Sequence, residues 1–561
     1  MNIVSPLAAM ALVSLSGLAN AQTVVPSDAS PTCAVSAVEF ANWFTAGTVT
    51  ANGGVDPADS ITFPNIPNCS FYKWSEQMFL WLTSPVPSKY GGGTHVFNSP
   101  VFYDVSPLDA GGQRTLVPNI PGRIRIFGVK ISQLGPQSKP VVFDNTGKMF
   151  TLVRPEVGPS GKPLIRNKAG QPVEIERTQI APNGRPIFLD KAGKAIDQQV
   201  AQNGTPRVLD RSGKPIDFRL NKIVVNGRPF FLDGSGNAIE TEQGQADGNV
   251  LMAQGGKLVY YALQVNAMYA YFLTGTKKTP GGISPTPTLF PTTATDLNLI
   301  KAFGLAHSKA FPDPNALAVE LKSAWIEAAG LDASKYVMMT ATIPTFDTSN
   351  PQHWVQNGSK QAQLALVGMH VVGSAAGHPE MIWATFEHVN NTRNAPYSYI
   401  NAANATINVP QNNAGTWLFS TTPPTATPNQ PLMFVSGSDI IAISSTPIGP
   451  SDMLRINPWG SPGSSASKNT EVIAINNSVI GMLAAGDVRK NYIMTGTTWT
   501  IFGQPPNAGN QVGTNKMANT TMESFFQGGN CFSCHDGSNM LGGTGGSGLS
   551  HIWGPLKQLF P

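Results

Sequence analysis

Five consecutive residues near the C-terminus have the types and the spacing to do chemistry. They read Cys531-Phe532-Ser533-Cys534-His535, a C-x-x-C-H arrangement. Two thiols at this spacing can add to the vinyl groups of a haem as thioethers, and the adjoining imidazole can bind the iron as its proximal ligand. We therefore expect one covalent haem c, attached to Cys531 and Cys534 with His535 on the iron.

Two other chemistries use paired cysteines. A thioredoxin-like pair belongs at a strand-to-helix turn in a βαβ unit, whereas the sequence around Cys531 is rich in Gly. A zinc site needs a second pair of ligands at a suitable spacing. His378-Pro379-Glu380 has the form of half a zinc deaminase signature, but it lies far upstream, and no proline precedes Cys531. Haem attachment is the favoured interpretation.

The position of the motif determines which part of the chain must enclose the haem. Only 26 residues follow His535, and many of them are Gly or Ser, so this tail cannot enclose a porphyrin. We expect the haem to pack against the large upstream body. His551 is the favoured distal ligand, because it lies 16 positions beyond His535 and has ample reach. Met540, His370 and His388 are alternatives, as is an open site that would permit O₂ or peroxide chemistry.

The first 21 residues have the pattern of a secretory signal peptide. A small-residue and apolar run from Pro6 to Leu18 precedes Ala19-Asn20-Ala21, an A-x-A cleavage site. No later stretch reaches the roughly 18 consecutive apolar residues of a membrane span. We expect cleavage after Ala21 and a periplasmic or secreted mature chain without a transmembrane segment.

The four cysteines divide into two pairs. Cys531 and Cys534 belong to the haem motif, which leaves Cys33 and Cys69 in the N-terminal part of the mature chain. In an oxidising compartment two remaining cysteines most simply pair. We expect a Cys33–Cys69 disulfide.

Residues 140–245 contain an internal repeat. Asn-Gly is a strong hairpin-turn signal because both residues tolerate positive φ, and it marks one turn of each unit at Asn183-Gly184, Asn203-Gly204 and Asn226-Gly227. The glycines of the second turn recur mostly at intervals of 23 residues, namely Gly147, Gly170, Gly193, Gly213 and Gly236. The pattern predicts an inserted array of stacked β-hairpins.

The repeat region holds most of the positive charge. Residues 121–230 contain 19 Lys and Arg against 8 Asp and Glu, a net charge of +11, whereas the whole chain is +4. A basic array suits electrostatic steering toward an acidic redox partner or an anionic surface. Solvation of the outer faces of the hairpins explains the same charges equally well. Nucleic acid is not an expected partner of an exported protein.

The remaining patterns indicate an α+β chain that is predominantly β with several helices. Apolar spacing predicts helices over 68–83, 296–303, 315–329, 477–485 and 516–527, and strands over 337–343, 363–372 and 381–388. The expected segments are a signal peptide (1–21), an N-terminal part of the body (22–139), the hairpin array (140–245), the main body (246–514) and a short, helical haem-bearing tail packed on the body (515–561).

Three stretches of the later half resemble a family of large exported bacterial monohaem proteins, the cytochrome c family proteins. They are Ala365-Leu-Val-Gly-Met-His-Val-Val372, Glu380-Met-Ile-Trp-Ala-Thr-Phe-Glu-His-Val-Asn390 and Met517-Ala-Asn-Thr-Thr-Met-Glu523. The resemblance covers residues 320–540 and implies a c-type haem on Cys531, Cys534 and His535, with electron transfer. It implies no substrate, and the hairpin array falls outside it.

Three functions are compatible with these observations. An electron carrier or haem-bearing redox subunit is favoured, because there is a single haem motif and no dinucleotide, phosphate-loop, zinc-protease or serine-hydrolase signature. A haem-dependent oxidase, oxygenase or peroxidase is the first alternative, since a simple carrier does not need so large a body. The second is a protein whose body binds a partner or surface and presents the haem.

Overall fold

The computed structural model describes residues 25–560 with gaps. The gaps are 65–67, 108–112, 123–124, 130–140, 144–148, 154, 157–162, 176, 203, 211–212, 226–227, 240–248, 314, 414, 437, 443–446, 508, 526, 529, 534, 536–548, 551 and 555. The expected signal peptide lies outside the described residues. No helix in the described ranges is long and apolar enough to cross a bilayer.

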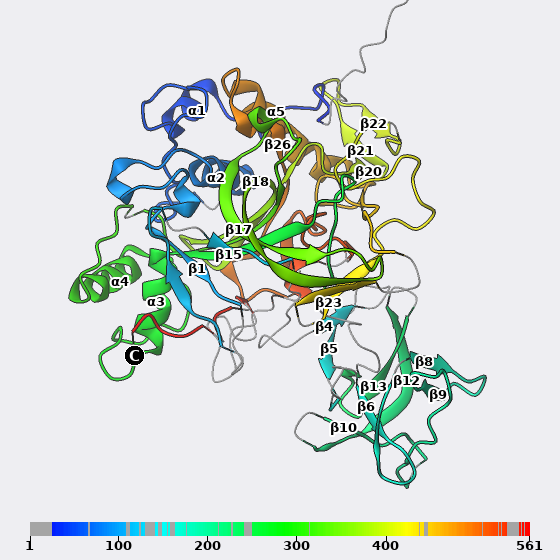
Figure 1. Ribbon diagram of the computed structural model, residues 1–561. Helices are drawn as coiled ribbons and strands as arrows, with labels where there is room; N and C mark the ends of the chain where they lie inside the picture. The colour runs from blue at the N-terminus through cyan, green and yellow to red at the C-terminus, as the bar shows by residue number, and fades with distance from the viewer. Residues whose placement is uncertain are drawn as a thin grey trace, which may run out of the picture.

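The body is built on one large sheet of twelve strands (Figure 1). Its main path runs β2 (Leu116–Pro118), β1 (Phe102–Val105), β15 (Val259–Asn266), β16 (Val319–Glu327), β18 (His353–Ala375), β19 (His378–His388), β26 (Tyr492–Thr500) and β27 (Gln511–Gly513). Neighbours along this path are antiparallel. The chain is thus an α+β protein that is predominantly β, as expected.

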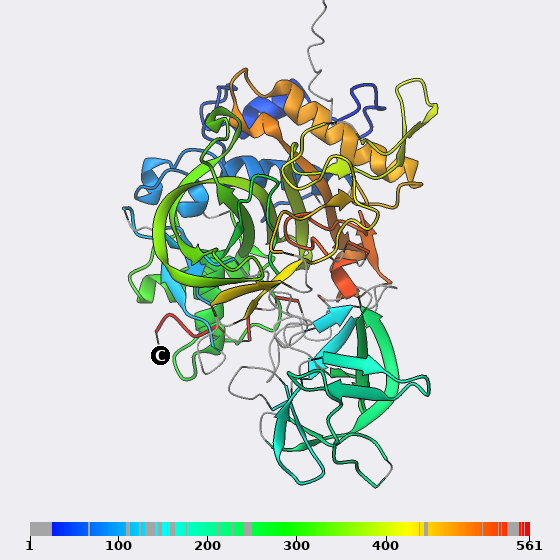
Figure 2. The same ribbon diagram turned by 45° about the vertical axis from the view of Figure 1, so that its right-hand side comes forward.

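Strand β18 links two parts of this sheet. Over its 23 residues it pairs first with β17 (Met338–Asp347) and then with β16 and β19. Its start also pairs with β24 (Asp439–Ala442), the partner of β23 (Met433–Ser436). The strands around residues 338–375 curve strongly (Figure 2). The sheet therefore wraps around part of its own core.

Both faces of the central strands are covered. Every residue of β19 and of β26 is buried, so neither strand shows the polar–apolar alternation of a half-exposed sheet. On one face, helices α1 (Ala37–Trp43), α2 (Cys69–Leu82) and α5 (Ala466–Met482) pack over an extended apolar core. On the other face lie α3 (Ala267–Lys277), α4 (Ala294–Ala306) and the C-terminal tail. This second face carries the candidate site.

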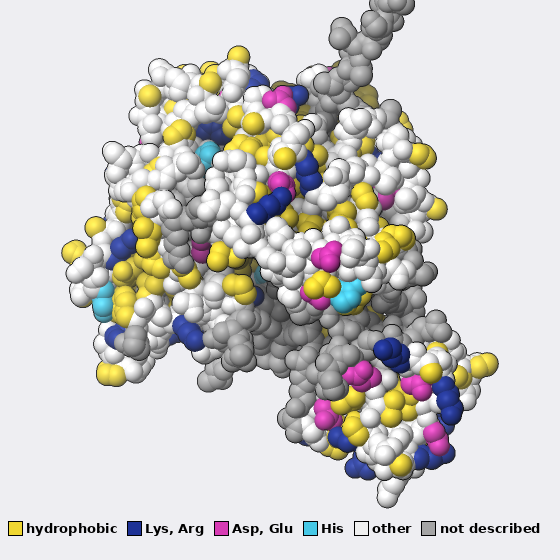
Figure 3. Space-filling view, viewed as in Figure 1, with side chains coloured by type: hydrophobic (Ala, Val, Ile, Leu, Met, Phe, Trp, Pro, Cys, Tyr) yellow, Lys and Arg dark blue, Asp and Glu magenta, His cyan; other side chains and the backbone are white. Residues whose placement is uncertain are grey.

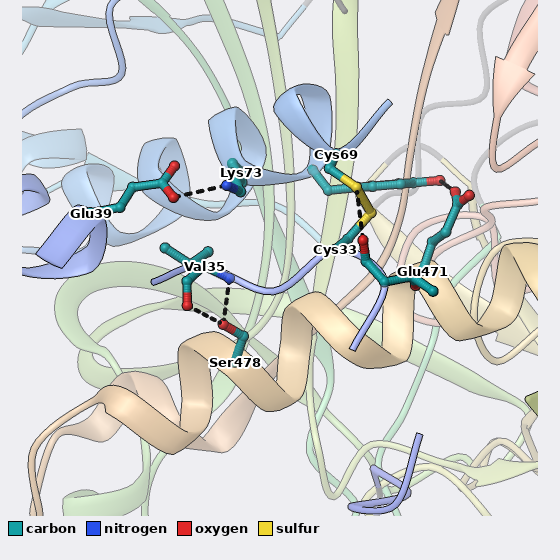
Figure 4. Close-up of a disulfide and its surroundings, with 9 residues drawn as sticks. Cys33, Val35, Glu39, Cys69, Lys73, Glu471 and Ser478 are labelled. Carbon is teal, nitrogen blue, oxygen red and sulfur yellow. Dashed lines mark hydrogen bonds and ion pairs between the residues drawn. A yellow bond between two sulfur atoms is a disulfide. The ribbon is translucent and has the colours of Figure 1, made fainter. Parts of the chain in front are cut away.

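The N-terminal segment is tied to the helices of the first face. Cys33 and Cys69 form the expected disulfide at the start of α2 (Figure 4). Beside it, the backbone N–H of Val35 donates to Oγ of Ser478 on α5 across 2.7 Å. The helix expected over 68–83 is α2, whose apolar face is fully buried.

One expected helix is a strand. Residues 315–329 contain β16, which pairs along its length with β15 and β18. The reason lies in Val319, Leu321 and Ser323, which are buried and alternate with the half-buried Glu320 and Lys322. This period of two belongs to a strand, and in the sheet it outweighs the helical spacing that the same apolar residues also allow.

The repeat region forms hairpins, as expected, in a lobe that projects from the body (Figure 1). Its hairpins are β4–β5 (Val141–Phe143, Met149–Val153), β6–β7 (Leu164–Arg166, Pro172–Glu174), β8–β9 (Arg177–Ile180, Pro186–Leu189), β10–β11 (Val208–Leu209, Pro215–Ile216) and β12–β13 (Phe218–Val225, Arg228–Asp233). Strand β14 (Ala238–Ile239) joins β13 to β5. Turn glycines such as Gly184 and Gly193 have φ of 79° and 74°, where a side chain would be strained.

The charges of the lobe are unevenly presented to solvent (Figure 3). Turn aspartates such as Asp190 and Asp210 accept backbone N–H groups and are half-buried. Among the described lobe residues the exposed acidic side chains are Asp197 and Asp217. The exposed basic ones are Lys168, Arg185, Lys191, Lys194, Arg207, Lys214, Arg219 and Lys222. Among the described lobe residues, therefore, more basic than acidic side chains are exposed to solvent.

Candidate haem attachment site

The C-x-x-C-H motif begins with one helical turn. Cys531–Ser533 is a 3₁₀ helix, and the backbone N–H of His535 donates to the carbonyl of Cys531 across 2.9 Å. This bond spans four positions, so His535 follows Cys531 by one turn, as joint binding of one haem requires. Phe532 is 1% exposed and anchors the turn in the core. Cys534 lies outside the described residues.

The His535 ring is oriented by a backbone carbonyl. Its Nδ1 lies 2.7 Å from the carbonyl oxygen of Leu549. A carbonyl only accepts hydrogen bonds, so Nδ1 carries a proton, and in the neutral ring the lone pair is then on Nε2. Binding to a metal through Nε2 while Nδ1 donates to a backbone carbonyl is the usual arrangement of a histidine ligand. His535 thus has the tautomer that a proximal ligand needs.

An aromatic residue of the sheet packs against the same ring. The centroid of the Trp383 indole lies 4.3 Å from that of His535, with the planes at 47°. Trp383 also meets Phe532 edge-on, with 6.2 Å between centroids. Both belong to an apolar cluster with buried tail and sheet residues, among them Met381, Met517, Leu549, Ile552 and Trp553. Such surroundings suit a haem, which is largely apolar.

The segment before the motif is fastened to the sheet by side chains. Nδ2 of Asn519 donates to Oγ1 of Thr385 (2.9 Å) and to the carbonyl of Phe386 (3.0 Å), both on β19. The backbone N–H of Thr520 donates to Oε1 of Glu387 across 2.8 Å, and the Thr520 hydroxyl donates to the same carboxylate. The residues quoted above for the family resemblance therefore meet in space.

The helix expected over 516–527 is not formed: its described residues are turns and irregular chain. The reason is local. Oδ1 of Asn519 accepts the N–H of Thr521, and the N–H of Asn519 itself donates to Oε2 of Glu523. Asn and Thr side chains that bond nearby backbone groups in this way compete with a helix. In the described part of the tail only the short 3₁₀ turn at Cys531–Ser533 is helical.

Two glycines of the sheet make room for this segment. A Cβ at Gly368 on β18 would lie 2.8 Å from Oδ1 of Asn519. A Cβ at Gly496 on β26 would lie 2.9 Å from Cβ of Met517. Both distances are shorter than real contacts allow, so the chain leading to the haem motif can approach the sheet only because glycine stands at these positions.

The residues after the motif return to the body. Oγ of Ser550 lies 2.7 Å from the Tyr269 hydroxyl and donates to Oε2 of Glu320 across 2.6 Å. Lys277, at the end of α3, donates to the carbonyls of Trp553 and of Leu556. The tail therefore packs on the body, as expected for a segment too short to enclose a porphyrin.

His370, one of the expected alternatives for the distal ligand, lies on the same face of the sheet as His535. It stands opposite Thr385, whose side chain lies two positions from Trp383 on β19. Its Nε2 is 3.1 Å from each carboxylate oxygen of Glu523. Burial acts to raise the pKa of Glu523, but the interactions with His370, the charge of Lys322 and the backbone N–H of Asn519 together lower this pKa to about 2. Binding of iron by His370 would compete with this carboxylate.

His388 lies on the opposite face. Its ring stacks on Tyr336 with 4.1 Å between centroids, and no part of the residue is exposed. Both ring nitrogens are engaged: Nε2 lies 3.1 Å from the Lys335 carbonyl, and Nδ1 accepts the N–H of Asn390. Burial lowers the pKa of His388 to about 3, so it is neutral in the core. The structure does not bring it together with His535.

The other two expected distal ligands, Met540 and His551, lie outside the described residues. The neighbours of His551 are described: Ser550 and Ile552 are 1% and 3% exposed, and Ser550 is bonded to the sheet. His551 is therefore flanked on both sides by anchored residues. Within the described ranges, no three His, Cys, Asp or Glu side chains converge as a metal-ion site would need.

Sequence reasoning missed two of the groups around His535. The Leu549 carbonyl carries no side-chain signal at all. Trp383 stands in the Glu380–Asn390 stretch. It is surrounded there by other core residues, so nothing in the sequence distinguished it from an ordinary buried side chain. The available signal was the alternation of side chains along a strand, which puts Trp383, Thr385 and Glu387 on one face. Glu387 is polar, which distinguishes this face from an ordinary apolar one.

Comparisons of the chain with protein-family models, with curated proteins and with solved structures find no match. The interpretation of the site therefore rests on the motif and on its geometry. The His535 tautomer, the helical turn at Cys531 and the apolar surroundings fit a c-type haem.

Proposed function

We propose that this chain is an exported, periplasmic or secreted protein that carries one covalent haem c and transfers electrons through it. The observation that supports this most directly is the 2.7 Å contact between Nδ1 of His535 and the Leu549 carbonyl, within a C-x-x-C-H turn. The family resemblance and the cleavage site after Ala21 agree with it.

Each group of the site has a role in this proposal. The haem would supply an iron that cycles between the ferric and ferrous states. Cys531 and Cys534 would hold it by thioethers, His535 would bind it through Nε2, and the Leu549 carbonyl would keep the tautomer that makes this binding possible. The apolar cluster excludes water, which favours a stable ligand set over substrate binding.

We propose an acidic redox partner for the basic lobe. The outward lysines and arginines of the hairpins provide a positive field that increases the rate of encounter with an acidic protein at low ionic strength. In this arrangement the lobe acts as a docking module and the haem segment as the redox centre.

Attachment is tested by producing the chain in an exporting host that has the machinery for c-type haem maturation. The wild type is expected to gain the mass of one haem and to give a c-type haemochrome spectrum, while a Cys531→Ser/Cys534→Ser variant, exported in the same way, gains neither. An exported wild type without covalent haem contradicts the proposal.

The distal ligand is tested on the same preparation. We propose His551, so His551→Ala is expected to convert a low-spin ferric spectrum to a high-spin one, while His370→Ala and His388→Ala leave it low-spin. An unchanged spectrum of the His551→Ala protein would eliminate His551 and direct attention to Met540 or His370.

A haem-dependent oxidase or peroxidase is the second candidate function. It is favoured by the pair of His370 and Glu523, which lies on the His535 face of the sheet. The Glu523 side chain is 32% exposed. Such a pair could donate and accept protons beside a reacting oxygen. High-spin wild-type iron that binds CO when reduced would support this function; low-spin iron that ignores CO would exclude it.

A further inference from the structure

We propose that Trp383 is a positioning residue for the haem: it holds the plane of the His535 imidazole and keeps water from the proximal side. This inference rests on the proposed haem function and adds a residue to it. Its basis is the 4.3 Å separation of the two ring centroids, the smallest distance between His535 and any described aromatic ring.

Trp383 can act in this way only if it is itself held in place. Its Nε1 donates to the carbonyl of Glu380, three positions earlier on β19, across 2.9 Å. Its backbone is paired on both sides, with Val372 on β18 and with Thr498 on β26. With 9% of its surface exposed, the indole has little freedom to swing away.

Glu380 is held in turn by its buried carboxylate. Oε1 of Glu380 lies 2.8 Å from Nδ1 of His378 and accepts from both the N–H and the hydroxyl of Thr500. Neither His378 nor Glu380 is more than 2% exposed. A contiguous set of contacts therefore runs from the core to the indole and on to His535.

The backbone beside Glu380 carries a further sign of constraint. Met381 has a φ of 66°, a conformation that L side chains rarely adopt, and it is completely buried. A non-glycine residue keeps such a conformation only when its surroundings determine it. This constrained residue lies between Glu380, which bonds Thr500, and Trp383, which contacts His535.

An aromatic wall against a proximal imidazole has definite consequences for a haem. It restricts rotation of the ring about its bond to the iron, which sets how the ligand orbitals overlap with those of the metal. It also lowers the local polarity, which disfavours the more highly charged ferric state and raises the reduction potential. Both consequences can be measured without any assay of activity.

Trp499 provides a matched control. It is a buried tryptophan of β26, on the same sheet, with 3% of its surface exposed. It stacks on Phe71 of α2 at 3.8 Å and belongs to the apolar core of the other face. Replacing it removes a comparable indole from the core of the other face, where Phe71 separates it from His378 and hence from the Glu380–Trp383 contacts.

The experiment compares wild type, Trp383→Phe, Trp383→Leu and Trp499→Phe, all matured with haem. For each we would measure covalent haem by mass, the EPR g values of the ferric protein and the midpoint potential. We expect full haem attachment throughout, g values that shift slightly in Trp383→Phe and clearly in Trp383→Leu, and a lowered potential in both. Trp499→Phe should keep the wild-type g values and potential.

The outcomes separate the two proposals. Wild type without covalent haem overturns the proposed function. Wild type with haem, but with the same g values and potential in the Trp383 variants as in Trp499→Phe, overturns the role of Trp383 alone. If Trp383→Leu fails to fold, Trp383→Phe keeps a ring in the core and still lacks the hydrogen bond to Glu380, so its g values decide.

Discussion

Nη2 of Arg455 lies 2.7 Å from Oε2 of Glu387, and neither side chain has any exposed surface. Oε1 of the same carboxylate accepts the backbone N–H of Thr520, and Nη1 of Arg455 donates to Oδ1 of Asn394 across 2.6 Å. One buried ion pair thus connects the short strand Leu454–Arg455, the end of β19 and the segment that leads into the C-x-x-C-H motif. It ties the segment before the motif to the body.

Removing one member of this pair should leave an uncompensated buried charge. We expect Arg455→Met to lower the free energy of unfolding by roughly 3–5 kcal/mol, as is typical when a buried pair is broken. Hydrogen exchange of the amides near Thr520 should accelerate at the same time. Chemical denaturation and exchange would measure both effects.

The control for this prediction is Lys335→Met, which breaks a surface pair with Asp332 whose side chains are 55% and 56% exposed. This variant should lose less than about 1 kcal/mol in its free energy of unfolding. Equal losses in the two variants would show that the buried network does not stabilise the haem segment.

Gly368 should not tolerate even a methyl group. In Gly368→Ala the new Cβ would press on Asn519 and Thr521, which hold the segment before the motif. We expect a loss of roughly 1–3 kcal/mol, typical of overpacking, together with a fall in the yield of covalently attached haem. Gly128→Ala is the control, because nothing lies within 4 Å of its added Cβ. Full haem loading of the Gly368→Ala protein would argue that the close approach is unimportant.

Glu76 makes stability depend on pH. Burial raises its pKa from 4.5 to about 8, so between these pH values the folded chain holds a proton that the unfolded chain has released. Stability contributed by this proton is therefore lost as the pH rises from 4.5 to 8. We expect Glu76→Gln to match wild type at pH 5 and to be more stable by up to about 3 kcal/mol at pH 7.

Thermal unfolding of the two proteins at pH 5, 7 and 8 would measure this difference. Glu39→Gln, on the exposed ion pair with Lys73, is the control and should cost less than about 1 kcal/mol. A Glu76→Gln protein that is destabilised at pH 8 would mean that the carboxylate is needed in its charged form.

The disulfide should contribute stability without touching the haem. Cys33 and Cys69 are separated by 36 positions, and closing a loop of this length stabilises the fold by about 4 kcal/mol on the chain-entropy estimate. Cys33→Ala/Cys69→Ala should unfold at correspondingly lower denaturant and keep the wild-type optical spectrum. A changed haem spectrum would imply that the N-terminal segment supports the site.

Several features of the molecule follow from local sequence. The C-x-x-C-H motif and the hairpin turns at residues such as Gly193 could be predicted, because each depends on neighbouring positions. The pairing of Cys33 with Cys69 could be predicted because only these two cysteines remain outside the motif. The strands expected over 363–372 and 381–388 are the later part of β18 and most of β19, and they could be predicted because apolar runs favour a buried strand.

Other elements needed the tertiary structure. Residues 319–327 carry both a period of two and a helical spacing, and only pairing with β15 and β18 selects the strand. Residues 516–527 have helical apolar spacing, but Asn519 and Thr520 bond Thr385 and Glu387 of β19 in place of a helix. Propensity is a small free energy, so tertiary contacts of this kind override it.

The candidate site divides in the same way. The sequence by itself determined that Cys531 and His535 can serve one haem, because their spacing places them one helical turn apart. Only the tertiary structure decided what surrounds the imidazole: the Leu549 carbonyl, fourteen positions away, and the Trp383 indole, on a strand of the body. A backbone carbonyl exists at every residue, and a tryptophan fits any core, so no residue type could mark these two groups before the chain had folded.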